Sequence, residues 1–146
     1  MSEGRDRGLQ FVDTNILVYA HDPSAGAKRQ VATRLLENLW DSRRGCVSIQ
    51  VLEEFYVVVT SKARPPLPRS RAREIVTAYR VWPVHSPIVS DVERAIEIQE
   101  RHGISFWDAM IVASASRLEC EILWSEDLSH GQAYEGVIVK NPFAGI

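Results

Sequence analysis

The stretch that decides the fold is Leu9-Gln10-Phe11-Val12, followed at once by Asp13-Thr14-Asn15. A short apolar run that ends in turn-forming polar residues indicates a buried β-strand, with Asp13 at its carboxyl end. The residues from Asn15 to Ala20 can begin a short helix, which ends before Pro23. The chain is therefore predicted to open with a strand, a carboxylate and a helix.

Helix-like and strand-like segments alternate through the rest of the chain. Helices are predicted where apolar residues recur at intervals of three and four, and strands where short apolar runs lie between turn signals. The predicted helices cover 26–42 with Ser24 as N-cap, 48–59 with Ser48 as cap, 71–79, 90–102 with a capping box from Ser90 to Glu93 and Gly103 after its end, and 106–118 with Ser105 as cap. The predicted further strands are 46–47, 81–84, 122–124 and 137–139, and 62–70 is a proline-rich loop.

This alternation favours an α/β sandwich with a parallel sheet. Ligands bind such sheets beyond the carboxyl ends of the strands. Asp13 and Asp127 both fall at predicted strand ends, which is the first indication of a functional site. The length of 146 residues fits one domain, 1–146, preceded by a polar N-terminal leader over residues 1–8.

The composition excludes some functional classes. The formal net charge is −2, so the chain lacks the overall basic field of a protein that coats nucleic acid, although an enzyme with an acidic metal site is still allowed. Cys46 and Cys120 form no CxxC pair and are expected to be small buried residues. No apolar run approaches the ~20 residues of a membrane helix, and the N-terminus has no apolar signal core. We therefore expect a cytoplasmic protein with no membrane contact.

Three aspartates map to separate elements at one edge of the predicted sheet: Asp13, Asp108 and Asp127. Each has a structural interpretation that is favoured when it is taken alone. Asp13 and Asp127 fit Asx-turns or N-caps, and Asp108 fits a capping box with Ser105 at the start of an otherwise apolar helix. Their joint placement favours a site, because clustered carboxylates repel one another unless a cation or a proton is bound.

A fourth carboxylate comes from the helix that begins near Ser48, where Glu53 and Glu54 are adjacent. On a helical wheel both lie at the edges of the apolar stripe, so periodicity does not separate them. Oxygen ligands select Mg²⁺ or Mn²⁺ rather than zinc. The histidines show no zinc-site spacing and are expected at the surface or in loops; they are His21, His85, His102 and His130.

Four short segments spread over almost the whole chain carry a resemblance. They are Phe11-Val12-Asp13-Thr14-Asn15-Ile16-Leu17, Gln50-Val51-Leu52-Glu53-Glu54-Phe55-Tyr56, Asp108-Ala109-Met110-Ile111 and Leu123-Trp124-Ser125-Glu126-Asp127-Leu128. Taken together and in this order, they resemble the PIN-domain nucleases, and within them the VapC toxins of bacterial toxin–antitoxin pairs. The resemblance implies a PIN-like three-layer sandwich, with a short, mostly parallel central sheet flanked by helices.

The resemblance also assigns roles to individual residues. It implies that the catalytic, metal-binding acids are Asp13, Glu54, Asp108 and Asp127, and that Thr14, Asn15 and Ser125 lie beside them. Glu53 falls where relatives often carry a non-acidic polar residue, so the resemblance ranks Glu54 above it. Ser125-Glu126-Asp127 departs from the commoner Thr-x-Asp form of the family but keeps the hydroxyl.

The activity that the resemblance implies is Mg²⁺- or Mn²⁺-dependent endonucleolytic cleavage of RNA. It also implies inhibition by a cognate antitoxin protein and a homodimer. Basic residues around the proline-rich loop could track RNA phosphates, but a solvated loop is the favoured interpretation; they are Lys62, Arg64, Arg69, Arg71 and Arg73. Phe106 and Trp107 are expected in the core rather than as a platform for bases.

Two other functions are weighed against this one. An aspartyl-phosphate phosphatase of the haloacid dehalogenase type would use Asp13 as nucleophile, but the second aspartate of its DxD motif is replaced here by Asn15. A catalytically silent PIN-like module that binds RNA or protein is the second alternative. The complete set of acids disfavours the silent module.

Overall fold

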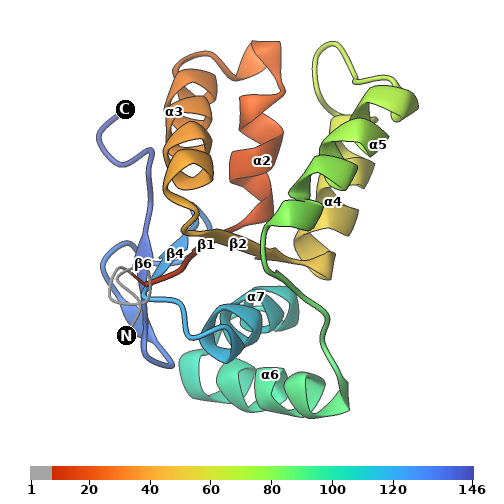
Figure 1. Ribbon diagram of the computed structural model, residues 1–146. Coiled ribbons are helices and arrows are strands. Elements are labelled where there is room, and N and C mark those ends of the chain that lie inside the picture. The colour runs from red at the N-terminus through yellow and green to blue at the C-terminus, as the bar shows by residue number, and fades with distance from the viewer. Residues whose placement is uncertain (1–7) are drawn as a thin grey trace.

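The computed structural model describes residues 8–146 (Figure 1). Within this range, six strands form one sheet in the order β3-β2-β1-β4-β6-β5. They are β1 (Gln10–Val12), β2 (Gly45–Ser48), β3 (Val84–His85), β4 (Ile122–Trp124), β5 (Ala133–Tyr134) and β6 (Val137–Lys140). Every neighbouring pair is parallel except β5 with β6. The predicted α/β class with a mostly parallel sheet is confirmed. Most of the predicted leader, residues 1–7, lies outside the described residues.

Helices cover both faces of the sheet, which gives three layers (Figure 1). On one side lie α2 (Thr14–Ala20), α3 (Ala27–Ser42), α4 (Ile49–Val59) and α5 (Arg69–Ala78), and on the other lie α6 (Val89–His102) and α7 (Phe106–Arg117). Strand β1 lies between β2 and β4 and is buried at all three residues. A parallel strand with both neighbours and both faces covered has no exposed side, which is why its sequence is a continuous apolar run rather than an alternating one. None of the helices in the described range is long and apolar enough to cross a membrane.

Several helix boundaries agree with the sequence signals. The Ser48 hydroxyl accepts a hydrogen bond from the Val51 backbone N–H and caps α4, and Ser105 caps α7 in the same way. Gly103 ends α6 in the left-handed conformation, with φ of 66°. These three boundaries could be predicted because the signals are local to the helix ends.

Other boundaries were predicted wrongly. Ser24 does not cap α3; it lies in the 3-10 turn Pro23–Ala25, where its backbone N–H is bonded to Asp22, and α3 begins after Gly26. The box predicted from Ser90 to Glu93 is replaced by Asp91, which accepts from the Ile88 backbone N–H at 2.8 Å, so α6 begins one residue earlier.

The remaining differences concern short elements. Helix α5 begins at Arg69, directly after Pro68, rather than at residue 71. A 3-10 turn at Tyr79–Val81 extends beyond α5 and takes up the start of the strand predicted at 81–84, which leaves only Val84–His85 as β3. Strand β5, of two residues, was not predicted, because so short a segment has no periodicity of its own.

The two cysteines, Cys46 and Cys120, are buried, as predicted, and their side chains are in contact. Their sulfur atoms lie 3.1 Å apart although 74 residues separate them in sequence. Cys46 is on β2 and Cys120 lies two residues before β4, the two strands that flank β1. The proximity is a product of the parallel sheet order, which neither cysteine's local sequence could reveal.

Gly45, at the start of β2, is required by a close approach rather than by its backbone angles. A Cβ atom there would lie 2.5 Å from Cη2 of the buried Trp82 ring, which packs against Tyr79 and Trp40. We predict that Gly45→Ala destabilises the protein by about 1–3 kcal/mol, because the ring must shift out of a packed site. Thermal denaturation would show a fall of several degrees, whereas Asn38→Ala, at an exposed site of α3, should leave the melting temperature within about one degree of wild type. An unchanged melting temperature for Gly45→Ala would contradict this packing account.

Candidate active site

The four predicted acids lie around one pocket of about 260 Å³, called here the acidic pocket. Asp13 follows β1 directly, Asp127 follows β4 after a short turn, Glu54 comes from the middle of α4 and Asp108 from the first turn of α7. The lining is completed by Thr14, Asn15, Gln50, Val58, Trp107 and Ile111. The sheet order explains this meeting, since β1 and β4 are parallel neighbours and α4 and α7 come from opposite faces of the sheet.

Asp13 is the most buried of the four carboxylates, at 5% exposure. Its Oδ1 accepts from the Thr14 backbone N–H at 2.7 Å and caps α2, and its Oδ2 accepts from the Ser125 hydroxyl at 2.8 Å. Burial raises the pKa of Asp13 to about 7; these two hydrogen bonds lower it in part, and the charges of Asp127 and Asp108 raise it further. The Asp13 side chain therefore caps α2, as one interpretation predicts, and also lines the acidic pocket.

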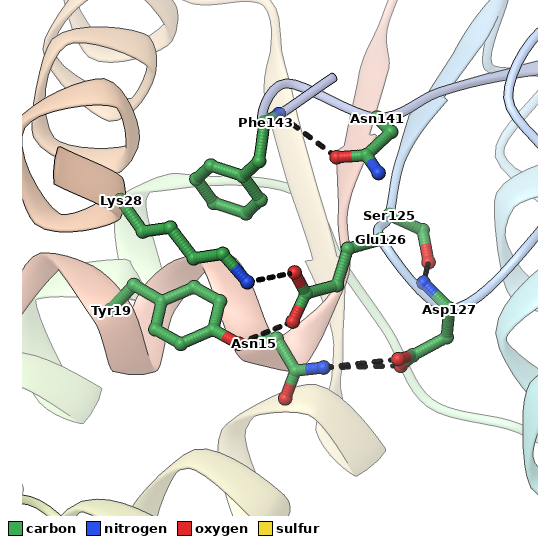
Figure 2. Close-up of polar contacts among 8 residues, drawn as sticks. All are labelled: Asn15, Tyr19, Lys28, Ser125, Glu126, Asp127, Asn141 and Phe143. Carbon is green, nitrogen blue, oxygen red and sulfur yellow. Dashed lines mark hydrogen bonds and ion pairs between the residues drawn. The ribbon is translucent and has the colours of Figure 1, made fainter. Parts of the chain in front are cut away.

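Ser125 joins two of the acids. Its hydroxyl donates to Asp13 and accepts from the Asp127 backbone N–H at 3.1 Å. Figure 2 shows the second of these bonds and, beside it, the Asn15 amide, which donates to both carboxylate oxygens of Asp127 at 3.3 and 3.2 Å. Burial raises the pKa of Asp127, and the neighbouring negative charges, Asp108 first, add to this. The Ser125 hydroxyl therefore links the Asp13 carboxylate to the backbone of Asp127.

The structure separates Glu54 from Glu53. The Glu54 carboxylate accepts from the Thr14 hydroxyl at 2.7 Å and from the Gln50 amide at 3.3 Å, and it lines the acidic pocket. Glu53 is exposed and lines a different hollow, an apolar groove between α4 and α5. One residue along a helix turns the side chain by about 100°, so only the packing of α4 decides which glutamate faces the other acids.

The capping box predicted at the start of α7 is only half formed. The Ser105 hydroxyl accepts from the Asp108 backbone N–H at 3.1 Å, as predicted. Within residues 8–146, the Asp108 carboxylate makes no hydrogen bond in return and lines the acidic pocket instead. The structural interpretation of Ser105 holds, while the side chain of Asp108 stays open to a ligand.

A group next to Asp127 was missed by the sequence analysis. Glu126 accepts from the Lys28 ammonium group at 2.9 Å and from the Tyr19 hydroxyl, and it is largely shielded from solvent (Figure 2). The ammonium group also lies 5.0 and 5.4 Å from the ring centres of Tyr19 and Phe143. These contacts tie the turn after β4 to α2, α3 and the C-terminal segment. No local signal marks them, because the partners lie about a hundred residues apart in sequence.

Some predicted residues do not take part in the acidic pocket. None of the five basic residues from Lys62 to Arg73 lines it, and two of them, Arg69 and Arg73, line the apolar groove between α4 and α5. His85 was expected near the surface, but its side chain is 10% exposed, and its Nδ1 lies 2.9 Å from the Ser114 hydroxyl. The other prediction that fails is a core position for Trp107, which is 62% exposed at the rim of the acidic pocket.

The lining fits a hydrated hard cation better than zinc. The described residues that line the acidic pocket offer carboxylate, amide and hydroxyl oxygens but include no histidine, cysteine, lysine or arginine. Within residues 8–146, no three acidic, histidine or cysteine side chains are arranged so that they could hold a metal ion by themselves. Mg²⁺ does not require three protein ligands, because it is commonly held through one or two carboxylates and several waters. In addition, the buried Oε1 atom of Gln50 has no hydrogen-bond partner in the described part of the chain, so it is free to accept from such a water.

Solved structures of similar fold include several toxins. A toxin–antitoxin complex from Klebsiella pneumoniae gives a TM-score of 0.67 at 20% identity, over 92% of this chain and 98% of that chain. VapBC2 from Rickettsia felis, bound to a DNA fragment from its promoter, gives 0.63 at 20% identity, over 91% and 98%. VapC20 from Mycobacterium tuberculosis, a sarcin–ricin loop cleaving toxin, gives 0.61 at 23% identity, over 80% and 88%.

At these identities the similarity shows a shared fold and nothing finer. The comparison with curated proteins gave no match. The PIN domain model matches residues 11–135, which contain all four acids of the pocket, all of β1 but its first residue, the whole of β4 and both helices that present the other acids. The chain therefore belongs to the PIN-domain family.

Proposed function

We propose that this chain, over residues 1–146, is a metal-dependent endoribonuclease and the toxin of a toxin–antitoxin pair. The observation that carries the proposal is the acidic pocket itself, in which four carboxylates face one hollow whose lining, over the part of the chain that the structure describes, has no basic side chain. Their mutual repulsion calls for a cation, and their oxygen atoms suit Mg²⁺ or Mn²⁺. A bound ion of this kind would polarise a phosphodiester and lower the pKa of an attacking water.

The residues of the chain have separate tasks in this proposal. Asp13, Glu54 and Asp108 hold the ion, directly or through water, and Asp127 orients water or holds a second ion. Ser125 and Thr14 keep Asp13 and Glu54 in place through the hydrogen bonds described above. Asn15 holds both oxygens of Asp127. These supports reduce the reorganisation needed when the ion and the substrate bind.

The partners are proposed from the neighbouring structures. RNA as the substrate is supported by VapC20, which cleaves the sarcin–ricin loop. A cognate antitoxin is supported by the Klebsiella and Rickettsia structures, which are toxin–antitoxin assemblies. The homodimer and the cytoplasmic location stay predictions.

The direct test is incubation of the purified chain with a defined set of RNAs in Mg²⁺ or Mn²⁺, with cleavage sites mapped at nucleotide resolution. We expect discrete internal cuts that EDTA abolishes. A chain that binds Mn²⁺ or RNA but never cuts would support the silent module instead, and release of phosphate from a phosphomonoester would support the phosphatase.

The adjacent glutamates provide a matched pair of variants. We predict that Glu54→Gln lowers the cleavage rate on the order of a hundredfold or more, because the change removes a charge from the ion site. Glu53→Gln should stay within about twofold of wild type, because Glu53 faces the other groove and surface changes of this kind are nearly neutral. Equal losses in the two variants, measured as initial rates on one RNA, would refute the assignment.

The raised pKa of Asp13 gives a prediction on stability without metal. In EDTA, the unfolded chain releases the Asp13 proton near the ordinary value of 3.8, whereas the folded chain holds it up to about pH 7. The free energy of unfolding of the wild type therefore falls as the pH rises between these values, by an amount on the order of a few kcal/mol. Above them it stays at the lower value. Asp13→Asn has no such proton to lose. Its melting temperature relative to wild type should rise from about pH 4.5 to pH 8.

The matched control for that series is Asp41→Asn, at an exposed site, whose difference from wild type should not change with pH in this way. At pH 8 in EDTA we expect Asp13→Asn to melt above wild type. In millimolar Mn²⁺ we expect wild type to melt above Asp13→Asn, because the ion stabilises only a chain that binds it. An Asp13→Asn difference that is the same at all pH values would show that burial of the charge does not govern stability.

A further inference from the structure

Trp107 is an exposed aromatic residue on a helix whose middle part is buried. Its side chain is 62% exposed, whereas Ala109 to Ala115 are all buried. It lines the acidic pocket together with Ile111 and Val58, and it is adjacent in sequence to Asp108. A flat apolar surface thus borders the carboxylates on the α7 side. An apolar side chain stabilises the fold only where it is buried, so the exposed part of Trp107 adds nothing to folding stability. A role in binding is therefore the natural interpretation.

The position of Trp107 is fixed from two directions. Its ring packs against the Phe106 ring in a T-shaped arrangement, with centres 5.1 Å apart and planes at 75°, and Phe106 packs on the core. Its backbone carbonyl accepts from the Gln50 amide at 3.3 Å, and the same amide donates to Glu54. One side chain therefore sets the separation between the aromatic residue and an acid of the pocket, which limits the freedom that would be lost when a ligand binds.

We infer that the acidic pocket takes an unpaired nucleotide of single-stranded RNA, with its base stacked on the Trp107 indole. The inference rests on the proposed function and adds the residue that holds the base of the substrate. A base within a duplex is covered on both faces, so only an unstacked base can use the ring. Among residues 8–146 no basic side chain lines the acidic pocket, so the lining offers no ion pair to phosphate from these residues, whereas the Trp107 ring does offer a stacking surface to a base.

The test measures binding apart from cleavage. A fluorescently labelled single-stranded oligoribonucleotide of eight mixed bases is titrated with the full chain, with Ca²⁺ in place of Mg²⁺, and the same sequence is tested as a perfect duplex. We expect Trp107→Ala to weaken single-strand binding about tenfold or more, and Trp107→Phe to keep most of the affinity. Trp40→Ala is the control, since Trp40 is 38% exposed and does not line the acidic pocket. Quenching of tryptophan fluorescence by the RNA should be reduced in Trp107→Ala alone.

The outcomes separate this inference from the proposed function. If the wild type cuts RNA and Trp107→Ala, with an unchanged melting temperature, binds and cuts as well as wild type, the stacking inference is wrong and the nuclease proposal stands. If no RNA is cut but Trp107→Ala still weakens single-strand binding, the stacking inference stands and the nuclease proposal fails. A Trp107→Ala chain with a lower oligomeric mass and unchanged RNA affinity would make Trp107 a protein contact and overturn the inference. Tighter binding of duplex than of single strand would overturn it too.

Discussion

A buried carboxylate at the end of the central strand is the constraint on which the site depends. Asp13 lies where β1 ends and is largely shielded from water, so its carboxylate needs hydrogen-bond donors or must hold a proton. The chain supplies two donors, the backbone of α2 through Thr14 and the hydroxyl of Ser125 from the turn after β4. Because Ser125 also receives the Asp127 N–H, satisfying one acid positions a second. The geometry of the acidic pocket follows from this small network more than from any single ligand.

The sequence predicts the parts of this arrangement that are recorded locally. An apolar run ending at Asp13, a serine before an apolar helix at Ser105 and a glycine at position 103 each act within a few residues, and each is observed. The choice between Glu53 and Glu54 is different, because both are compatible with the helix, and only its packing against α2 and α7 separates them. The resemblance to a known family ranked the two glutamates where periodicity could not.

Trp107 shows the limit of pattern reading most clearly. An apolar helix predicts burial, and α7 is buried from Ala109 to Ala115, but periodicity cannot say whether a neighbour covers the first turn as well. The contacts of Glu126 with Lys28 and Tyr19, and of Cys46 with Cys120, are hidden for a related reason. They join residues that are brought together only by the order of strands in the sheet.

That strand order has a consequence for synthesis of the chain. Strand β4, which pairs with β1, and Ser125, whose hydroxyl bonds to Asp13 across 112 residues of sequence, are translated long after β1 itself. Strand β6, which pairs with β4, and Phe143, which lies against Lys28, come later still. Contacts so distant along the chain form late. A nascent chain that extends only through α4 contains Asp13 and Glu54 but lacks Asp108, Ser125 and Asp127. The acidic pocket can therefore form only after β4 and the turn that follows it have been translated.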